Sequence, residues 1–149
     1  MGKSGCEKEF HCQEQGRGVT LTPSPRGAAL KIKIDDCLID NQEHVLKCDC
    51  LYFYQRSQSK RYVFLVELKG NNRHHALAQL AATKNHSKYI ELLNTVIPIK
   101  QIAIAIVSEK TKTTNRPSDE DWENEHNIRL KTIPIERDTT YDLKELLSK

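Results

Sequence analysis

Residues 101–108, with the sequence QIAIAIVS, contain no charged side chain. Such a run fits a central β-strand covered by other elements on both faces, because a half-exposed strand alternates polar and apolar residues. The chain must therefore place a layer on each side of a sheet. Its 149 residues, of which 38% are hydrophobic, are enough to build one domain of this kind.

Three segments before this run have the pattern of consecutive strands. The segment 29–39 alternates apolar and charged residues, as expected of a half-buried strand, and two further strands are expected at 44–54 and 61–69. Short polar turns at 40–43 and 55–60 separate the three segments. Strands joined by such short turns pair in antiparallel order, so the sequence predicts an antiparallel meander.

The apolar period changes after residue 70. From 73 to 94 the apolar residues recur near helical spacing, with the polar residues 84–87 as a candidate interruption. A helix that joins two neighbouring strands of one sheet requires them to be parallel, with a right-handed crossover. The run 101–108 should therefore be parallel to 61–69, and the predicted fold class is α/β with a mixed β-sheet.

The rest of the chain completes one domain, 1–149, in three parts: an N-terminal segment and flexible arm (1–28), a core (29–108), and a C-terminal strand and helix (109–149). The arm is expected at 16–28, which holds three Gly and two Pro. The other expected elements are a short helix in 1–15, a polar loop at 108–121, an edge strand at 127–135 and a short amphipathic helix at 140–148.

Composition restricts the classes of partner only weakly. The net charge of +3 permits a polyanionic partner without requiring one. No stretch approaches the roughly 20 apolar residues that cross a bilayer, and the first residues have no apolar signal region. We therefore expect a cytoplasmic protein with no membrane partner.

A group of charged residues lies at the ends of two expected neighbouring strands. Asp49 belongs to the second strand, and Glu67 and Lys69 share one face of the third. If the register allows, Asp49 lies beside Glu67, and two adjacent carboxylates stay ionised only with a cation between them. Oxygen ligands favour Mg²⁺ or Mn²⁺. Lys69 could then orient a water or stabilise charge developing on a phosphate.

Asp49, followed after seventeen residues by Glu67-Leu68-Lys69, resembles the motif of the PD-(D/E)XK nuclease superfamily, the restriction-endonuclease-like fold. The core of that family has the element order αβββαβ, which is the order expected here, and the resemblance covers roughly residues 30–108. One departure is Cys48, which stands where the motif has proline.

The resemblance implies a metal-dependent endonuclease that hydrolyses phosphodiester bonds, in DNA. Asp49, Glu67 and the backbone carbonyl of Leu68 would bind Mg²⁺ or Mn²⁺, and Lys69 would be the catalytic lysine. Gln79, on the following helix, would be a further site residue. A homodimer or a larger complex is expected by the same analogy. Some members add an acidic residue from the first helix, for which the candidates are Glu7, Glu9 and Glu14.

Two other interpretations remain open. Glu67 and Lys69 could be an ordinary charged pair at a strand end, with Asp49 on the surface; the triplet Asp142-Leu143-Lys144 repeats the pattern where a solvated helix face is expected. Alternatively, the fold could be a catalytically silent module that binds nucleic acid or a protein partner.

The five cysteines are an odd number in a chain with no apparent signal, which favours thiols or metal ligands over disulfides. They allow a structural Zn²⁺ site or, as the alternative, buried thiols that pack the N-terminal segment. The four candidate zinc ligands are Cys6, Cys12, Cys37 and Cys48.

Overall fold

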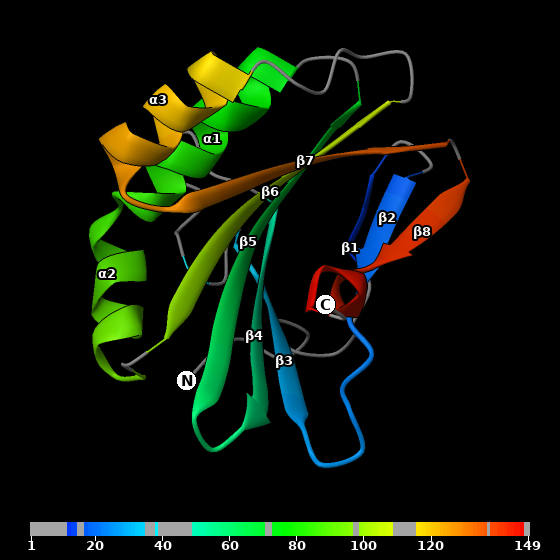
Figure 1. Ribbon diagram of the computed structural model, residues 1–149, viewed down its shortest axis with the longest axis vertical. Helices are drawn as coiled ribbons and strands as arrows, with labels where there is room; N and C mark the ends of the chain where they lie inside the picture. Colours follow the sequence, from blue (N-terminus) through cyan, green and yellow to red (C-terminus); the bar gives the residue numbers. More distant parts are fainter. Residues whose placement is uncertain are drawn as a thin grey trace.

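The protein is built on a five-stranded mixed sheet with the strand order β3-β4-β5-β6-β7 (Figure 1). The strands are β3 (Ala28–Lys33), β4 (Cys50–Ser57), β5 (Lys60–Gly70), β6 (Lys100–Ser108) and β7 (Arg129–Ile135). The predicted α/β class with a mixed sheet is confirmed. The computed structural model describes residues 12–14, 17–34, 38, 49–70, 73–96, 99–108, 116–136 and 138–147.

The pairing confirms the predicted meander and crossover. β3 with β4 and β4 with β5 are antiparallel, whereas β5 with β6 and β6 with β7 are parallel. The described part of the second strand is β4, which begins at Cys50, while residues 44–48 of the expected strand lie outside the described residues. The polar residues 55–57 extend β4 instead of forming a turn, which differs from the prediction. These residues are exposed, so the strand continues there without burying a polar side chain.

Two helices occupy the segment predicted to be helical, α1 (Arg73–Lys84) and α2 (Ser87–Asn94). The expected interruption is confirmed, and His86 forms the N-cap of α2 by accepting a hydrogen bond from the Lys88 N–H at 3.0 Å. This contact satisfies one of the backbone donors that a helix start leaves open.

A third helix, α3 (Arg116–His126), was not predicted. The expectation of a polar loop over 108–121 is wrong from residue 116 onward. The half-buried Trp122 packs against the core, and the Glu123 carboxylate accepts the Leu130 N–H of β7 at 2.7 Å. The helix ends at His126 and is followed by Asn127, whose φ of 54° is left-handed, a conformation that asparagine tolerates better than most residues.

The two faces of the large sheet carry separate apolar cores. The helices pack on one face (Figure 1), and their core includes Leu51, Val63, Leu65, Leu80 and Tyr89. The other face is covered by a three-stranded sheet and a terminal 3-10 helix at Leu143–Leu147. The strands of the small sheet are β1 (Cys12–Glu14), β2 (Arg17–Thr20) and β8 (Thr139–Asp142).

The small sheet corrects three expectations about the ends of the chain. Residues 12–14 form a strand and not part of a helix, and the expected flexible arm begins as β2. The expected helix at 140–148 is instead β8 followed by the 3-10 helix. β2 pairs in parallel with β8, so these short strands depend on a partner more than a hundred residues away in sequence. Local periodicity carries no information about such a partner.

Strand β6 is covered on both faces, as its uncharged sequence predicts. Residues 102–107 are all buried. Ala103 and Ala105 contribute to the helix-side core, while Ile102, Ile104 and Ile106 contribute to the other core. Small residues thus face the helices and large residues face the small sheet. β7 is an edge strand of the large sheet, also as predicted, and it accommodates Pro134, which cannot donate to a ladder.

Tyr52 links the two sheets. Its side chain on β4 is fully buried, and its hydroxyl donates a hydrogen bond to the Val19 carbonyl of β2 at 3.2 Å. Burial, and secondly the negative charge of Asp142, raise the pKa of Tyr52 well above its ordinary value. The phenol is therefore neutral in the folded protein at any pH near neutrality.

Replacing Tyr52 with phenylalanine should change how stability depends on pH. The pKa of Tyr52 is higher in the folded state than in the unfolded state. When the pH rises above about 10, the unfolded state therefore loses its proton first, and the unfolding free energy of the protein falls as the pH rises further. Tyr52→Phe should cost about 1 kcal/mol at pH 7 through the lost hydrogen bond. Its urea-derived unfolding free energy should then fall less steeply than that of the wild type above pH of about 10. Parallel alkaline profiles would contradict this role.

Candidate active site

Asp49 lies at the point where β4 begins beside β5. Cys50 pairs with Val66 and Leu51 pairs with Leu65, and Asp49 comes directly before this ladder. The Asp49 N–H donates to the Val66 carbonyl at 2.9 Å, one residue out of the ladder register. The structure thus brings Asp49 to the stretch of β5 that holds Glu67.

The Asp49 side chain is fixed by the backbone of β5. Its Oδ2 atom accepts a hydrogen bond from the Leu68 N–H at 2.9 Å. A carboxylate bonded to a backbone N–H is held more strongly than a neutral acceptor, because the bond is charge-assisted. Asp49 is only half-buried, so its carboxylate is anchored and yet in reach of solvent.

Glu67 is the most unusual member of the group, because its side chain is 0% exposed. It shares one face of β5 with Val63 and Leu65, both of which belong to the helix-side core. The interpretation that Glu67 marks the place where a strand meets water is therefore wrong. Burying a carboxylate costs free energy, and a buried carboxylate in this position is a candidate for function.

Lys69 lies at an irregularity of β5. In the pairing with β6, Leu68 faces Ile106 and Gly70 faces Val107, so Lys69 is an extra residue in the ladder. The Lys69 side chain is outside the described part of the structure. Bulges of this kind redirect side chains and are frequent beside active sites. Gly70 is the sequence signal for this bulge, since glycine inside a strand often marks one.

Gln79 lies on α1, the helix that packs against β5 and β6. Its neighbours on the inner side of the helix, Ala76 and Thr83, are fully buried, and the Oε1 atom of Gln79 is buried as well. The Gln79 backbone carbonyl also accepts the Thr83 hydroxyl at 3.1 Å. Gln79 and Glu67 thus belong to the two elements that meet in this layer.

The donor set of this group is oxygen only. It consists of the carboxylates of Asp49 and Glu67 and the peptide carbonyl of Leu68, which follows Glu67 in the chain. Mg²⁺ is commonly bound by one or two carboxylates together with water, so the residues present fit a hard divalent cation. Among the described residues no group of three or more His, Cys, Asp or Glu is placed to hold a metal ion.

The cysteine predictions have a mixed outcome. Cys50 is buried and disulfide-bonded, so the expectation of a free thiol or metal ligand is wrong there. The side chains of the other four, including the proposed zinc ligands Cys6, Cys12, Cys37 and Cys48, lie outside the described part of the chain. The same holds for Glu7, Glu9 and Glu14.

Asp142-Leu143-Lys144 is not a solvated helix face. The Asp142 Oδ1 atom accepts hydrogen bonds from the backbone N–H groups of Thr22 and Lys144, both at 3.1 Å, and Leu143 is fully buried. This second triplet joins the end of β8 to the loop after β2. It is a structural feature on the opposite side of the large sheet from the helices.

A scan against models of protein families finds no match, and searches of curated proteins and of solved structures find none either. No helix in the described ranges is long and apolar enough to span a membrane.

Removing the Asp49 carboxylate should weaken the junction of β4 and β5. A hydrogen bond to a charged group contributes about 1.5–3 kcal/mol, so Asp49→Ala should lower the unfolding free energy by about that amount. Asp49→Asn keeps an acceptor oxygen and should lose about half as much. Urea unfolding measures both variants. Asp121→Ala, at an exposed position of α3, is the matched control and should change little; equal effects at 49 and 121 would contradict the anchoring role.

Proposed function

We propose that this protein is a metal-dependent nuclease that hydrolyses phosphodiester bonds in DNA, with a restriction-endonuclease-like core. The observation that carries the proposal is the hydrogen bond from the Leu68 N–H to Asp49, which holds one carboxylate beside the strand of a second, buried carboxylate, Glu67. The order β3-β4-β5, then the helices α1 and α2, then β6 supports it, because it follows the βββαβ part of that family's core after its first helix.

In this proposal Asp49, Glu67 and the Leu68 carbonyl hold Mg²⁺ or Mn²⁺. The bound ion supplies Lewis-acid polarisation of the phosphate and a lower pKa for a water molecule. The protein positions the carboxylates. The Leu68 N–H orients Asp49 before substrate binds, and the apolar face around Glu67 keeps bulk water away. Lys69, at the bulge of β5, would orient the attacking water or stabilise the phosphate charge.

Gln79 would assist from α1. Its side chain is largely held in the layer between α1 and the sheet, where a neutral amide can orient a water or a carboxylate by hydrogen bonding without adding charge. Its role in this proposal is to position neighbouring groups.

The described residues form a single layered body around the large sheet, with no separate recognition module among them. A nuclease of this size gains contact with a DNA duplex by pairing with a second copy or by acting in a larger complex. We therefore include a homodimer or a larger complex in the proposal, by analogy with the nuclease superfamily that the sequence resembles.

The first test is cleavage of plasmid and branched DNA by purified protein with Mg²⁺ or Mn²⁺. Lys69→Ala should reduce the cleavage rate by about 100-fold or more, as expected for a group that stabilises a developing charge. Lys144→Ala is the matched control, because it removes the lysine of the second acid-Leu-Lys triplet at an exposed position. It should cleave as the wild type does.

Equal loss in both lysine variants would point to a general charge effect on DNA binding and not to a catalytic lysine. Wild-type cleavage by Lys69→Ala would show that the activity comes from other residues or from a contaminant. Circular dichroism of each variant checks that the fold is retained.

The complete burial of Glu67 favours a second candidate, a silent module of the same fold that binds nucleic acid or protein without turnover. Calorimetry with Mg²⁺ and Mn²⁺ separates the two candidates. The nuclease proposal predicts one binding event per chain that is lost in Glu67→Gln, because the amide removes the charge that holds the ion. A folded wild type with no such event, together with DNA binding, would favour the silent module.

A further inference from the structure

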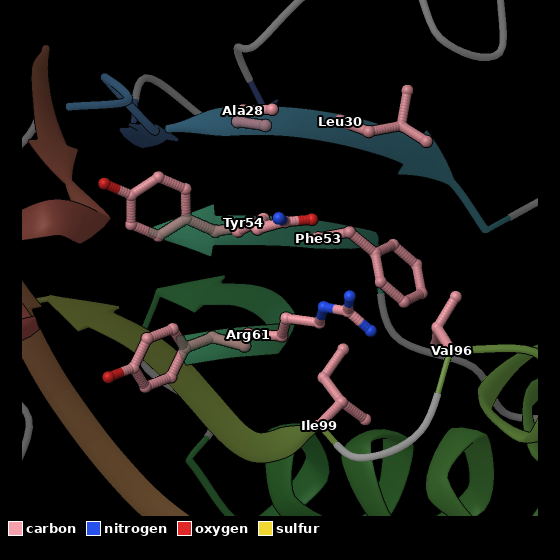
Figure 2. Close-up of a pocket in the computed structure, with 10 residues that line it drawn as sticks. Ala28, Leu30, Phe53, Tyr54, Arg61, Val96 and Ile99 are labelled. Carbon is pink, nitrogen blue, oxygen red and sulfur yellow. The ribbon is translucent and has the colours of Figure 1, made fainter. Parts of the chain in front are cut away.

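A second hollow lies at the other end of β5, far from the two carboxylates. It is a pocket of about 250 Å³ between the start of β3, the hairpin of β4 and β5, and the side chains of Val96 and Ile99 (Figure 2). Arg61 is six residues before Glu67 on β5, which is about 20 Å along a strand. The pocket is therefore a separate place on the same face of the sheet.

The pocket exists because the helix layer ends before the sheet does. α2 stops at Asn94, and of the described residues between it and β6, Val96 and Ile99 line the pocket. Phe53, Val96 and Ile99 pack against the helix-side core on one side and line the pocket on the other. Leu30 of β3 completes the apolar wall and is 38% exposed, a large value for a leucine.

One cation enters this apolar space. Arg61 faces Gln55 in the β4–β5 ladder, and its guanidinium points between Phe53 and Ile99 (Figure 2). The Arg61 Nε atom is buried, and among the described residues it has no hydrogen-bond partner. Leaving a buried donor unsatisfied costs about 1–3 kcal/mol. A ligand atom that accepts a hydrogen bond from this nitrogen would remove that cost.

No carboxylate is among the described lining residues, which are Ala28, Ala29, Leu30, Phe53, Tyr54, Gln55, Arg61, Tyr62, Val96 and Ile99. A negatively charged acceptor for Arg61 is therefore not supplied by the described lining and would have to come from a ligand. The planar guanidinium matches a carboxylate through two parallel hydrogen bonds. The remaining surface is apolar and includes the Phe53 ring, which suits a hydrocarbon body.

We propose that this pocket binds a small apolar carboxylate, with the acid group on Arg61 and the hydrocarbon body against Leu30, Phe53, Val96 and Ile99. A volume of about 250 Å³ holds a chain of the length of octanoate and excludes a folded partner. The site is independent of the proposed nuclease activity, because it shares no residue with Asp49, Glu67, Lys69 or Gln79.

The experiment is a titration of ¹⁵N-labelled protein with octanoate, followed through the Arg61 Nε–Hε signal and the backbone amides of residues 28–30, 53–55 and 61–62. Octanamide, which has the same shape and no charge, is the matched ligand. For a ligand of this size we expect a Kd of about 0.1–1 mM for octanoate. Octanamide should bind at least about 10-fold more weakly, because it lacks the charge-assisted bond.

Variants assign the effect to Arg61. Arg61→Gln should weaken octanoate binding by about 10-fold or more. Arg61→Lys keeps the positive charge but cannot form the two parallel hydrogen bonds of a guanidinium, so its affinity for octanoate should lie between those of Arg61→Gln and the wild type. Arg129→Gln removes an exposed arginine of β7 and should bind as the wild type does. The wild-type comparison of the two ligands stands even if a variant of Arg61 fails to fold.

Several outcomes overturn the proposal. These are equal binding of octanoate and octanamide, the absence of any shift of the Arg61 Nε–Hε signal up to about 10 mM octanoate, and equal weakening by Arg61→Gln and Arg129→Gln. A shift that spreads over the whole surface without saturation shows non-specific binding of an amphiphile, and it overturns the proposal as well.

Discussion

The burial of β6 on both faces is the constraint on which the rest of the structure depends. An uncharged strand in the middle of a sheet is stable only when a layer covers each face. The helices cover the side of Ala103 and Ala105, and the small sheet with the 3-10 helix covers the side of Ile102, Ile104 and Ile106. Because the small sheet joins β2 to β8, an early strand and the last described strand are held by this same requirement.

At the proposed nuclease site, a charged side chain occupies a position where the packing of the core favours an apolar one. Glu67 occupies a position of β5 where the preceding residues of its face, Val63 and Leu65, are apolar core. A protein selected for stability alone would place an apolar residue there. Asp49, anchored on Leu68, adds a second carboxylate at the same strand junction. A carboxylate buried at such a cost beside a second, anchored carboxylate is what the proposed metal-dependent site needs, and the metal and cleavage experiments test that explanation directly.

The sequence predicted the elements whose patterns are local. The meander, the helix pair with its break at His86 and the buried β6 follow from alternation, helical spacing and absence of charge. The small sheet and α3 did not follow, because the first depends on a distant partner strand and the second on an anchoring residue such as Trp122. The disulfide of Cys50 was not predicted either. For the site, the proximity of Asp49 to β5 was predictable from strand order, whereas the burial of Glu67 and the bulge at Lys69 depend on tertiary packing.

The helix-facing side of β5 explains how the proposed nuclease site and the pocket at Arg61 can both exist in so small a domain. Its residues in order are Arg61, Val63, Leu65 and Glu67, so a charge stands at each end of an apolar centre. The helices cover the centre and bury Glu67, but they end before Arg61, where a pocket remains. A longer α2 would bury the guanidinium further, and its Nε atom already has no hydrogen-bond partner among the described residues. The length of that helix thus decides whether Arg61 can meet a ligand, while the packing of α1 decides the environment of Glu67.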